Sequence, residues 1–374
     1  MAGDSQKLNE GELALYSMHL SSGYIPVGVD LAARVFQVCY LTEKQKIKNK
    51  ALSREAFLDF LKSPPFSQSL MVGFEACGGC NYWARFIEEL GHKYKIMPPS
   101  AIKSFLGKNK TDKIDAFGIF KGTICPSVRC IRARSEENQT LMNLLATREQ
   151  LIKQQTQSLN AQRAMLYELG EICGEGATKI DAATDKLKES LEKSQSEAIS
   201  NFRMIAEPIK ANRDSLEAQI KQIDLYLKQY AKNNRTVQNL MTIPGIGVLS
   251  AVTLHAVLGN PDDFPNSRHF ASFAGFAPTV KGSGGGEIQV GKIPHTGNRQ
   301  LKKILYMCAI ARFAQQSRKA STETEASKLT QLIDNPEISN KKIVCSIANR
   351  LARVAWTIAK SGEQFDPKKC RLLG

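Results

Sequence analysis

The feature that most limits the possible fold is an alternation of short apolar runs and amphipathic stretches between residues 24 and 122. Apolar runs of this length are typical of buried β-strands, and amphipathic stretches are typical of helices that pack on a sheet. Strands are predicted at 24–30, 35–41, 46–52, 69–76 and 92–99, and helices at 53–61, 81–91 and 111–122. Three strands followed by alternating helices and strands predict an α/β domain, with a strand order consistent with a ribonuclease-H-like fold.

Four acidic residues stand at informative places in this pattern. Asp30 and Glu75 end two of the apolar strands, and Asp112 and Asp115 lie three residues apart on one predicted helix, so the last two project from the same face. Four converging carboxylates repel one another unless cations hold them, which is the arrangement of a two-metal phosphoryl-transfer site for Mg²⁺ or Mn²⁺. Taken singly, each acid is more often an ordinary strand-end or helix-surface residue; the four together favour the metal site.

A second candidate site is the stretch 278–301, PTVKGSGGGEIQVGKIPHTGNRQL, which places one serine, Ser283, among glycines. A hydroxyl on a backbone that is free to adopt positive φ can approach a ligand closely. The cations around it favour an anionic ligand; they are Lys281, Lys292, Arg299, Lys302 and Lys303. The stretch therefore suggests a serine that attacks a phosphodiester, although an isolated run of this kind is more often a flexible turn between two strands.

Residues 135–236 form a polar block with a narrow apolar stripe. The stripe recurs every seven residues in the first part and with a 4-3 spacing in the second. Its positions are Leu145, Ile152, Leu159 and Leu166, then Leu216, Ile220, Ile223, Leu227 and Tyr230. The pattern predicts two long helices joined by a mixed segment, with the seams of a coiled coil. These seams could close on each other or on a second subunit.

From residue 237 onwards the chain is predicted to be mostly helical. Pro244, Gly245 and Gly247 separate two helical stretches, as in a helix-hairpin-helix element, whose backbone N–H groups contact a nucleic-acid phosphate. A plain turn between two helices is an equal competitor. His295 follows the serine closely, but with no acidic partner evident it is interpreted as a phosphate-contacting or surface residue rather than a base.

The charge balance indicates a polyanionic partner. The chain has 51 Lys and Arg residues against 36 Asp and Glu, a net charge of +15 and a pI near 9.4, and nucleic acid is the simplest partner for it. A basic linker with Lys108 and Lys110 precedes the helix at 111–122. No signal peptide and no apolar run of ~18 to 20 residues is evident. We therefore expect a cytoplasmic, nucleoid-associated protein with reduced cysteines, in which the C-x-x-C of Cys77 and Cys80 lacks a second pair of metal ligands.

Several stretches together resemble a known family in the same order along the chain. They are GVDLAARVFQV, GFEACGGCNYWARFIEELGH, GKNKTDKIDAF, LMTIPGIGVLSA, the run SGGGEIQVGKIPHTGNRQLKK and the closing IANRLARVAW. The chain is similar to transposases of bacterial insertion sequences, namely the insertion-sequence one-ten family and its eleven-eleven subgroup, which is related to the Piv and MooV DNA invertases. The resemblance covers residues 24–365 and leaves only the N-terminal segment outside it.

The sequence and the resemblance together predict a layout of four parts. A segment at 1–22, polar and flexible or at most a short helix, precedes a RuvC-like domain at 23–134, a coiled-coil domain at 135–236 and a mostly helical, serine-bearing transposase domain at 237–374. Carried over by position, a DEDD tetrad that binds Mg²⁺ or Mn²⁺ falls on Asp30, Glu75, Asp112 and Asp115, and the nucleophile falls on Ser283. Relatives often carry two serines before the glycines, and here the first is Gly282; Ser283, next to the glycines, is retained.

The resemblance also implies partners and a reaction. Members of the family look like recombinases guided by a non-coding bridge RNA that pairs with target and donor DNA. They act as dimers that assemble into tetramers, so that the tetrad of one subunit completes the site around the serine of another. Nucleic-acid contacts are expected at Lys108, Lys110, Gly245, Gly247, Lys281, Lys292 and Arg299.

The predicted reaction is DNA cleavage and rejoining through a phosphoserine link at Ser283, assisted by metal at the tetrad. Two alternatives stay open at this point. One is a metal-dependent, RuvC-like nuclease or junction resolvase in which water attacks and no covalent link forms. The other is a non-catalytic nucleic-acid-binding protein.

Overall fold

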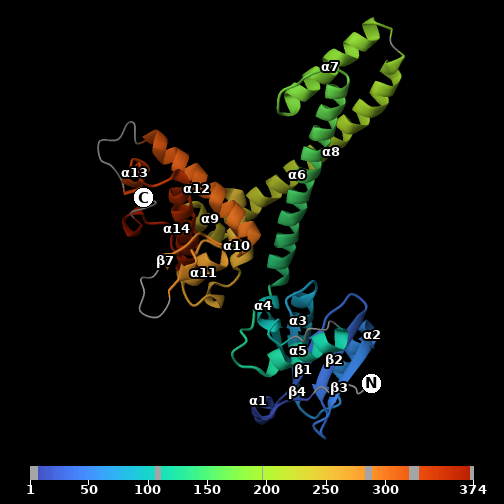
Figure 1. Ribbon diagram of the computed structural model, residues 1–374, viewed down its shortest axis with the longest axis vertical. Helices are drawn as coiled ribbons and strands as arrows, with labels where there is room; N and C mark the ends of the chain where they lie inside the picture. The colour runs from blue at the N-terminus through green and yellow to red at the C-terminus, as the bar shows by residue number, and fades with distance from the viewer. Residues whose placement is uncertain (1–6, 106–110, 196, 283–288, 320–327, 371–374) are drawn as a thin grey trace. The chain divides into compact units, whose positions relative to one another are not determined.

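The computed structural model describes residues 7–105, 111–195, 197–282, 289–319 and 328–370 (Figure 1). The chain forms two compact units, Met1–Ser135 and Glu136–Gly374. Within the described residues, no helix is both long enough and apolar enough to cross a membrane.

The N-terminal unit is built on a five-stranded mixed sheet with the order β3-β2-β1-β4-β5. Its strands are β1 (Tyr24–Asp30), β2 (Val35–Leu41), β3 (Ile47–Ser53), β4 (Ser69–Glu75) and β5 (Lys93–Met97). The first three strands pair antiparallel, and β4 and β5 extend the sheet in parallel from β1. The predicted α/β architecture is confirmed, and the sheet is consistent with a DEDD, RuvC-like domain.

Helices cover both faces of this sheet, because successive strand residues point to opposite sides. They are α1 (Glu10–Ser21), α2 (Arg54–Lys62), α3 (Cys80–Glu89), α4 (Pro99–Ile102) and α5 (Asp112–Ile124). One face packs against α2 and α3, where Phe36, Phe57 and Trp83 form a cluster with ring centroids 5.0 to 5.1 Å apart. The other face packs against α1 and α5 through Tyr16 and Phe120.

The helix starts follow local capping chemistry. Ser53 accepts a hydrogen bond from the backbone N–H of Ala56 and so begins α2, as its sequence position predicts. Thr111 does the same for α5 through the N–H of Ile114. Asn9 and Glu12 form a reciprocal capping box at the start of α1. These caps determine where the helices begin and therefore where their first-turn acids stand.

In its described residues, the C-terminal unit is helical apart from one short pair of strands. Its first helices are α6 (Glu136–Glu168), α7 (Ala177–Lys193) and α8 (Ala198–Asn233), followed by α9 (Arg235–Met241), α10 (Val248–Leu258), η1 (Pro261–Asp263) and α11 (Ser267–Phe273). The strands β6 (Val280–Lys281) and β7 (Gln289–Val290) come next, and then α12 (Arg299–Lys319), α13 (Lys328–Ile333), α14 (Asn340–Ser361) and η2 (Pro367–Lys369).

Helices α6 and α8 lie side by side, and α7 packs against both (Figure 1). The segment that joins the two long helices is therefore itself helical. Ile180, Ala183 and Leu187 of α7 are buried with Leu166 of α6. At the opposite ends of α6 and α8, Leu145 of α6 and Leu227 of α8 are buried in the main hydrophobic core of the unit. A supercoil and a second subunit at these seams stay predictions.

A buried polar network also joins these three helices. Arg213 of α8 donates to both carboxylate oxygens of Asp181 of α7, at 2.6 and 2.7 Å, and to Oε1 of Gln162 of α6, at 2.9 Å. Gln162 in turn donates to Oγ1 of Thr184 at 2.9 Å. Buried charges and amides need such partners to avoid a desolvation penalty, so the network fixes the alignment of the three helices.

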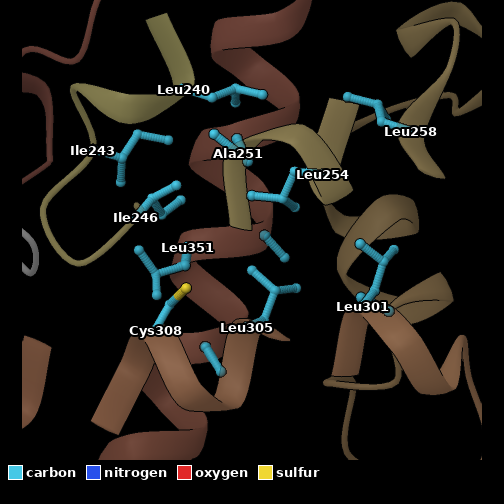
Figure 2. Close-up of a cluster of buried hydrophobic side chains, with 14 of the residues drawn as sticks. Leu240, Ile243, Ile246, Ala251, Leu254, Leu258, Leu301, Leu305, Cys308 and Leu351 are labelled. Carbon is cyan, nitrogen blue, oxygen red and sulfur yellow. The ribbon is translucent and has the colours of Figure 1, made fainter. Parts of the chain in front are cut away.

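The main hydrophobic core lies where α9, α10, α12 and α14 meet. Figure 2 shows Leu240 and Ile243 beside Ala251 and Leu254, with Leu305 and Cys308 of α12 facing them. The turn between α9 and α10 passes directly over α12. Gly245 in this turn has a φ of +89°, and a Cβ there would lie 2.9 Å from the carbonyl oxygen of Cys308. Both the positive φ and this close approach require glycine.

Candidate active site

Two glycines allow α5 to lie directly on the sheet. Gly28 of β1 and Gly73 of β4 are partners in the parallel register. A Cβ at Gly28 would lie 2.3 Å from the backbone nitrogen of Phe120, and a Cβ at Gly73 would lie 1.8 Å from Oγ1 of Thr123. Since neither distance leaves room for a side chain, this glycine seat brings the backbone of α5 against β1 and the side chain of Thr123 against β4.

The same seat explains why the four acids converge. Asp30 and Glu75 each follow a seat glycine by two residues, so they lie on the face of the sheet that α5 covers. Along α5, Asp112 is four residues before Ala116, whose carbonyl oxygen would lie 2.7 Å from a Cβ at Gly28. The face of α5 that packs on the sheet therefore includes the first turn of the helix, where Asp112 and Asp115 stand.

Electrostatics bears out this convergence at Asp30. Burial, and then the negative charges of Asp115, Asp112 and Glu75, raise the pKa of the Asp30 carboxyl. Asp30, Glu75 and Asp115 are half-buried, and Asp112 is exposed. The other three carboxylates thus act on Asp30 through space, and their charges repel it.

This donor set fits a divalent metal ion in its chemistry. Carboxylate oxygens are the ligands that hard cations such as Mg²⁺ and Mn²⁺ prefer, and a bound cation would offset the repulsion at Asp30. Among the described residues, no three acidic, histidine or cysteine side chains are drawn together into a ready coordination shell. Asp30, Glu75, Asp112 and Asp115 would hold the ion after their side chains turn towards it.

The neighbouring C-x-x-C does not add a thiolate to this site. Burial, followed by the charges of Cys80, Glu75 and Asp30, raises the pKa of the Cys77 thiol to about 11. Burial also raises the pKa of Cys80. Reactive and metal-binding cysteines usually have a lowered pKa, so the raised pKa of both thiols disfavours a thiolate here. The interpretation that the pair is not a metal or redox motif stays a prediction.

The lysine at the other end of α5 was not identified from the sequence. Lys95 of β5 donates from Nζ to three backbone carbonyls, those of Gly122 at 3.0 Å, Thr123 at 3.2 Å and Cys125 at 2.6 Å. An ammonium group at a helix C-terminus satisfies carbonyls that have no helical partner and complements the helix dipole. Lys95 therefore stabilises the end of α5 opposite the acids.

The glycine seat was also missed, although the sequence does carry a signal for it. Both strands contain the same short pattern, Gly28-Val29-Asp30 and Gly73-Phe74-Glu75. A glycine inside an apolar strand often marks a close backbone approach, and two such glycines at the same offset from an acid point to one shared contact.

The serine-bearing stretch is described at its two ends. Ser283, Lys108 and Lys110 lie outside the described residues. The strands on the two sides of residues 283–288, β6 and β7, pair antiparallel. Thr279 exchanges backbone hydrogen bonds with Gly291 and Lys292 at 2.7 and 3.1 Å. Lys281 is a residue of β6. Lys292 and Arg299, the other two basic residues of this stretch that are expected to contact nucleic acid, are exposed.

The glycines of the predicted hairpin have different surroundings. Gly245 is needed for packing against α12, as described above. Gly247 is exposed at the start of α10, and a Cβ there would meet nothing within 4 Å. Contact of this turn with a nucleic-acid phosphate stays a prediction, and packing alone accounts for the first glycine.

Comparison with known proteins identifies the class that this fold and site define. The family model described as "Transposase IS116/IS110/IS902 family" matches residues 237–323, and a DEDD transposase model of the IS110 group matches residues 27–170. The chain belongs to the IS116/IS110/IS902 family. It is an insertion-sequence transposase, a DNA-processing class of protein.

Individual relatives match over nearly the whole length. The transposase for insertion sequence element IS1328 of Yersinia enterocolitica is 29% identical, over 91% of this chain and 98% of the relative. The transposase for insertion sequence element IS1111A of Coxiella burnetii is 28% identical, over 91% of this chain and 90% of the relative. The pilin gene-inverting protein of Moraxella lacunata is 24% identical, over 91% and 98%. The family resemblance inferred from the motifs is thus confirmed.

Proposed function

We propose that the protein is a DNA recombinase that cuts and rejoins DNA through a covalent phosphoserine link at Ser283. The observation that carries this proposal is the convergence of Asp30, Glu75, Asp112 and Asp115 on the glycine seat, in a member of a transposase family. The tetrad provides the charge for a divalent-metal site, with Mg²⁺ or Mn²⁺ as the proposed ion. The serine supplies a nucleophile that the tetrad lacks.

The proposed reaction balances without an external energy source. The Oγ of Ser283 bonds to a backbone phosphorus and loses its proton, while the bond from phosphorus to the leaving sugar oxygen breaks and that oxygen gains a proton. The phosphodiester is thereby conserved as a phosphoserine ester. In rejoining, a sugar hydroxyl attacks the same phosphorus and Ser283 regains its proton. No ATP is needed, because one phosphate ester replaces another at each step.

The metal, when bound, polarises the phosphate and lowers the pKa of the attacking hydroxyl. The residues of the chain have separate roles around it. The tetrad holds the ion and orients the phosphate. We propose that Lys281 or Arg299 stabilises the negative charge that develops on the phosphate oxygens. Lys108, Lys110, Lys292, Gly245 and Gly247 are proposed to contact the nucleic acid.

The proposed partners follow from the family. Donor and target DNA are the substrates, and we propose a non-coding bridge RNA as the guide that selects them. We further propose a dimer that assembles into a tetramer, joined in part by the seams of α6 and α8. Some relatives are named for transposition and others for pilin-gene inversion. We therefore propose that the DNA sites supplied determine whether insertion or inversion results.

The nucleophile is tested by trapping the covalent intermediate. The chain is incubated with Mg²⁺, with DNA that carries the ends of its own element, and with the RNA transcribed from the flanking non-coding stretch. Denaturing gels are expected to reveal a protease-sensitive protein–DNA adduct. After trypsin and nuclease digestion, the peptide 282–292 is expected to carry a nucleotide, because Lys281 and Lys292 bound it.

The variants separate the proposal from its rivals. Ser283→Ala is expected to abolish the adduct, and Asp30→Asn to reduce it by about a hundredfold or more. Ser272→Ala, an exposed serine of α11, serves as the control. Strand cleavage that persists without adduct in Ser283→Ala would instead support a metal-dependent nuclease. DNA binding with no cleavage by the unmodified chain would support a binding protein.

A further inference from the structure

Three arginines gather where α11 and α14 meet. Arg350 and Arg353 of α14 line a pocket of about 170 Å³. Arg268 of α11 lies close enough for its charge to act on Arg353. A water molecule occupies about 30 Å³ of the liquid, so the pocket has room for a group with several oxygen atoms. The run IANRLARVAW, which contains two of these arginines, has no role in the reaction proposed above.

The guanidinium groups of this cluster lack anionic partners within the part of the chain that the structure describes. Nε of Arg353 is buried with no hydrogen-bond partner. Nε of Arg350 donates to Sγ of Cys370 at 3.1 Å, and sulfur is a weak acceptor. None of the three arginines forms an ion pair with a described carboxylate. A buried donor without a partner is costly in a folded protein, so a ligand that supplies acceptors would stabilise it.

Two carboxylates also line the pocket, and each has a partner in the segment that lines it. Glu363 pairs with Lys369 at 3.4 Å. Asp366 accepts a hydrogen bond from the backbone N–H of Lys368 at 2.9 Å and so begins η2. Arg350, Arg353 and Lys369 still outnumber these two carboxylates in the lining of the pocket, and Arg268 adds a further positive charge nearby. In agreement, burial and then the charges of Arg350 and Arg268 lower the pKa of Arg353.

We infer that this arginine pocket binds a backbone phosphate of DNA. Arginine presents a planar fork of donors that matches phosphate oxygens, and it is less strongly hydrated than lysine. Clustered arginines that repel one another in the free protein gain most when an anion enters. DNA is the polyanion on which a transposase acts, so the inference rests on the proposed function and adds a site to it.

The test measures DNA affinity as a function of salt. The full chain and the variants Arg353→Gln and Arg268→Gln are titrated against a duplex of about 30 base pairs of arbitrary sequence. Each lost phosphate contact is expected to reduce the slope of log K against log salt by about 0.9 and to weaken binding about eightfold near 0.1 M salt. Arg350 is left unchanged because it also holds Cys370.

Lys341→Gln is the matched control. It removes one charge from the same helix, is exposed, and lies 12 residues from Arg353, about 18 Å along the helix. Its slope is expected to match that of the unmodified chain. The melting temperature of Arg353→Gln is expected to stay level or rise, because the substitution removes repulsion from Arg350 and Arg268.

Several results would overturn the inference. They are unchanged slopes in both arginine variants, an equal loss in Lys341→Gln, a loss of affinity that only accompanies a lower melting temperature, or a loss seen with single-stranded RNA and not with duplex DNA. The proposed function is tested separately by Ser283→Ala. This variant is expected to bind DNA with the same slope of log K against log salt as the unmodified chain, and yet to form no adduct. At saturating protein concentration, the arginine variants are expected to form the adduct.

Discussion

At the scale of single residues, the glycines of the seat matter as much as the acids they precede. The carboxylates of the tetrad supply charge, but Gly28 and Gly73 determine how close the first turn of α5 comes to the strand ends. Catalytic groups lose efficiency steeply when they are displaced by about 1 Å. The seat is therefore part of the site, although it touches neither metal nor DNA.

A methyl group at Gly73 tests this role. Gly73→Ala would place its Cβ 1.8 Å from Oγ1 of Thr123, so α5 must move. We expect adduct formation to fall about a hundredfold, and the free energy of unfolding to fall by about 1 to 3 kcal/mol. Adduct yield and urea unfolding measure the two effects.

Gly78→Ala is the matched control, since a Cβ there would meet nothing within 4 Å. It lies in the same unit and adds the same methyl group. If Gly73→Ala were as active and as stable as Gly78→Ala, the close contact between α5 and β4 would not govern the site.

The elements that were predicted correctly are those with a strong local signal. The strands β1 and β2 have the predicted bounds, and β1 and β4 end at Asp30 and Glu75 as their apolar pattern predicts. The seat could not be derived in the same way, because it depends on the register between two strands that are far apart in sequence. Ser283 lies outside the described residues, so its part in the site rests on the family.

At the scale of elements, the three helices α6, α7 and α8 are held by a polar network within an apolar bundle. The sequence predicted the two long helices from their apolar stripe, but the stripe of α7 is too short and too polar to stand out. Ile180, Ala183 and Leu187 become buried only when α6 and α8 are already in place. Tertiary packing, rather than a local pattern, is what identifies α7.

The network makes a specific stability prediction. Arg213→Ala leaves Asp181 as a half-buried charge without its partner, and we expect a loss of about 3 to 5 kcal/mol in the free energy of unfolding. Lys221→Ala breaks the exposed pair with Glu217, at 2.7 Å on the same helix, and is expected to change stability far less, because water screens an exposed pair. Urea unfolding followed by helical circular dichroism measures both.

The double variant Arg213→Met with Asp181→Leu sharpens this test. Replacing both charges by apolar side chains is often close to neutral, so we expect it to recover most of the stability lost in Arg213→Ala. Equal and small losses in Arg213→Ala and Lys221→Ala would mean that the network does not hold α7 against α8.

At the scale of the whole molecule, the proposed catalytic groups are divided between the two compact units. The tetrad belongs to the N-terminal unit, and both Ser283 and the arginine pocket belong to the C-terminal unit. A site that needs both units can be completed within one chain or between chains. The proposed dimer makes the second arrangement testable by mixing subunits.

Mixed dimers of Asp30→Asn and Ser283→Ala distinguish the two arrangements. If the tetrad of one subunit serves the serine of another, half of the randomly mixed dimers carry one intact site of two, so about a quarter of the unmodified activity is expected. If each chain completes its own site, every site carries one defect and the adduct is absent. Adduct yield after joint refolding or co-expression measures the outcome, and each variant alone is the control.

The glycine seat also has a thermodynamic consequence. Where backbone meets backbone, few side-chain rotamers are frozen on folding, and few remain to fluctuate afterwards. The acids at the strand ends and the first turn of α5 are therefore tied to one nearly rigid frame. Less backbone entropy is then left to be lost when metal and DNA arrive, so more of their binding free energy is available to the reaction itself.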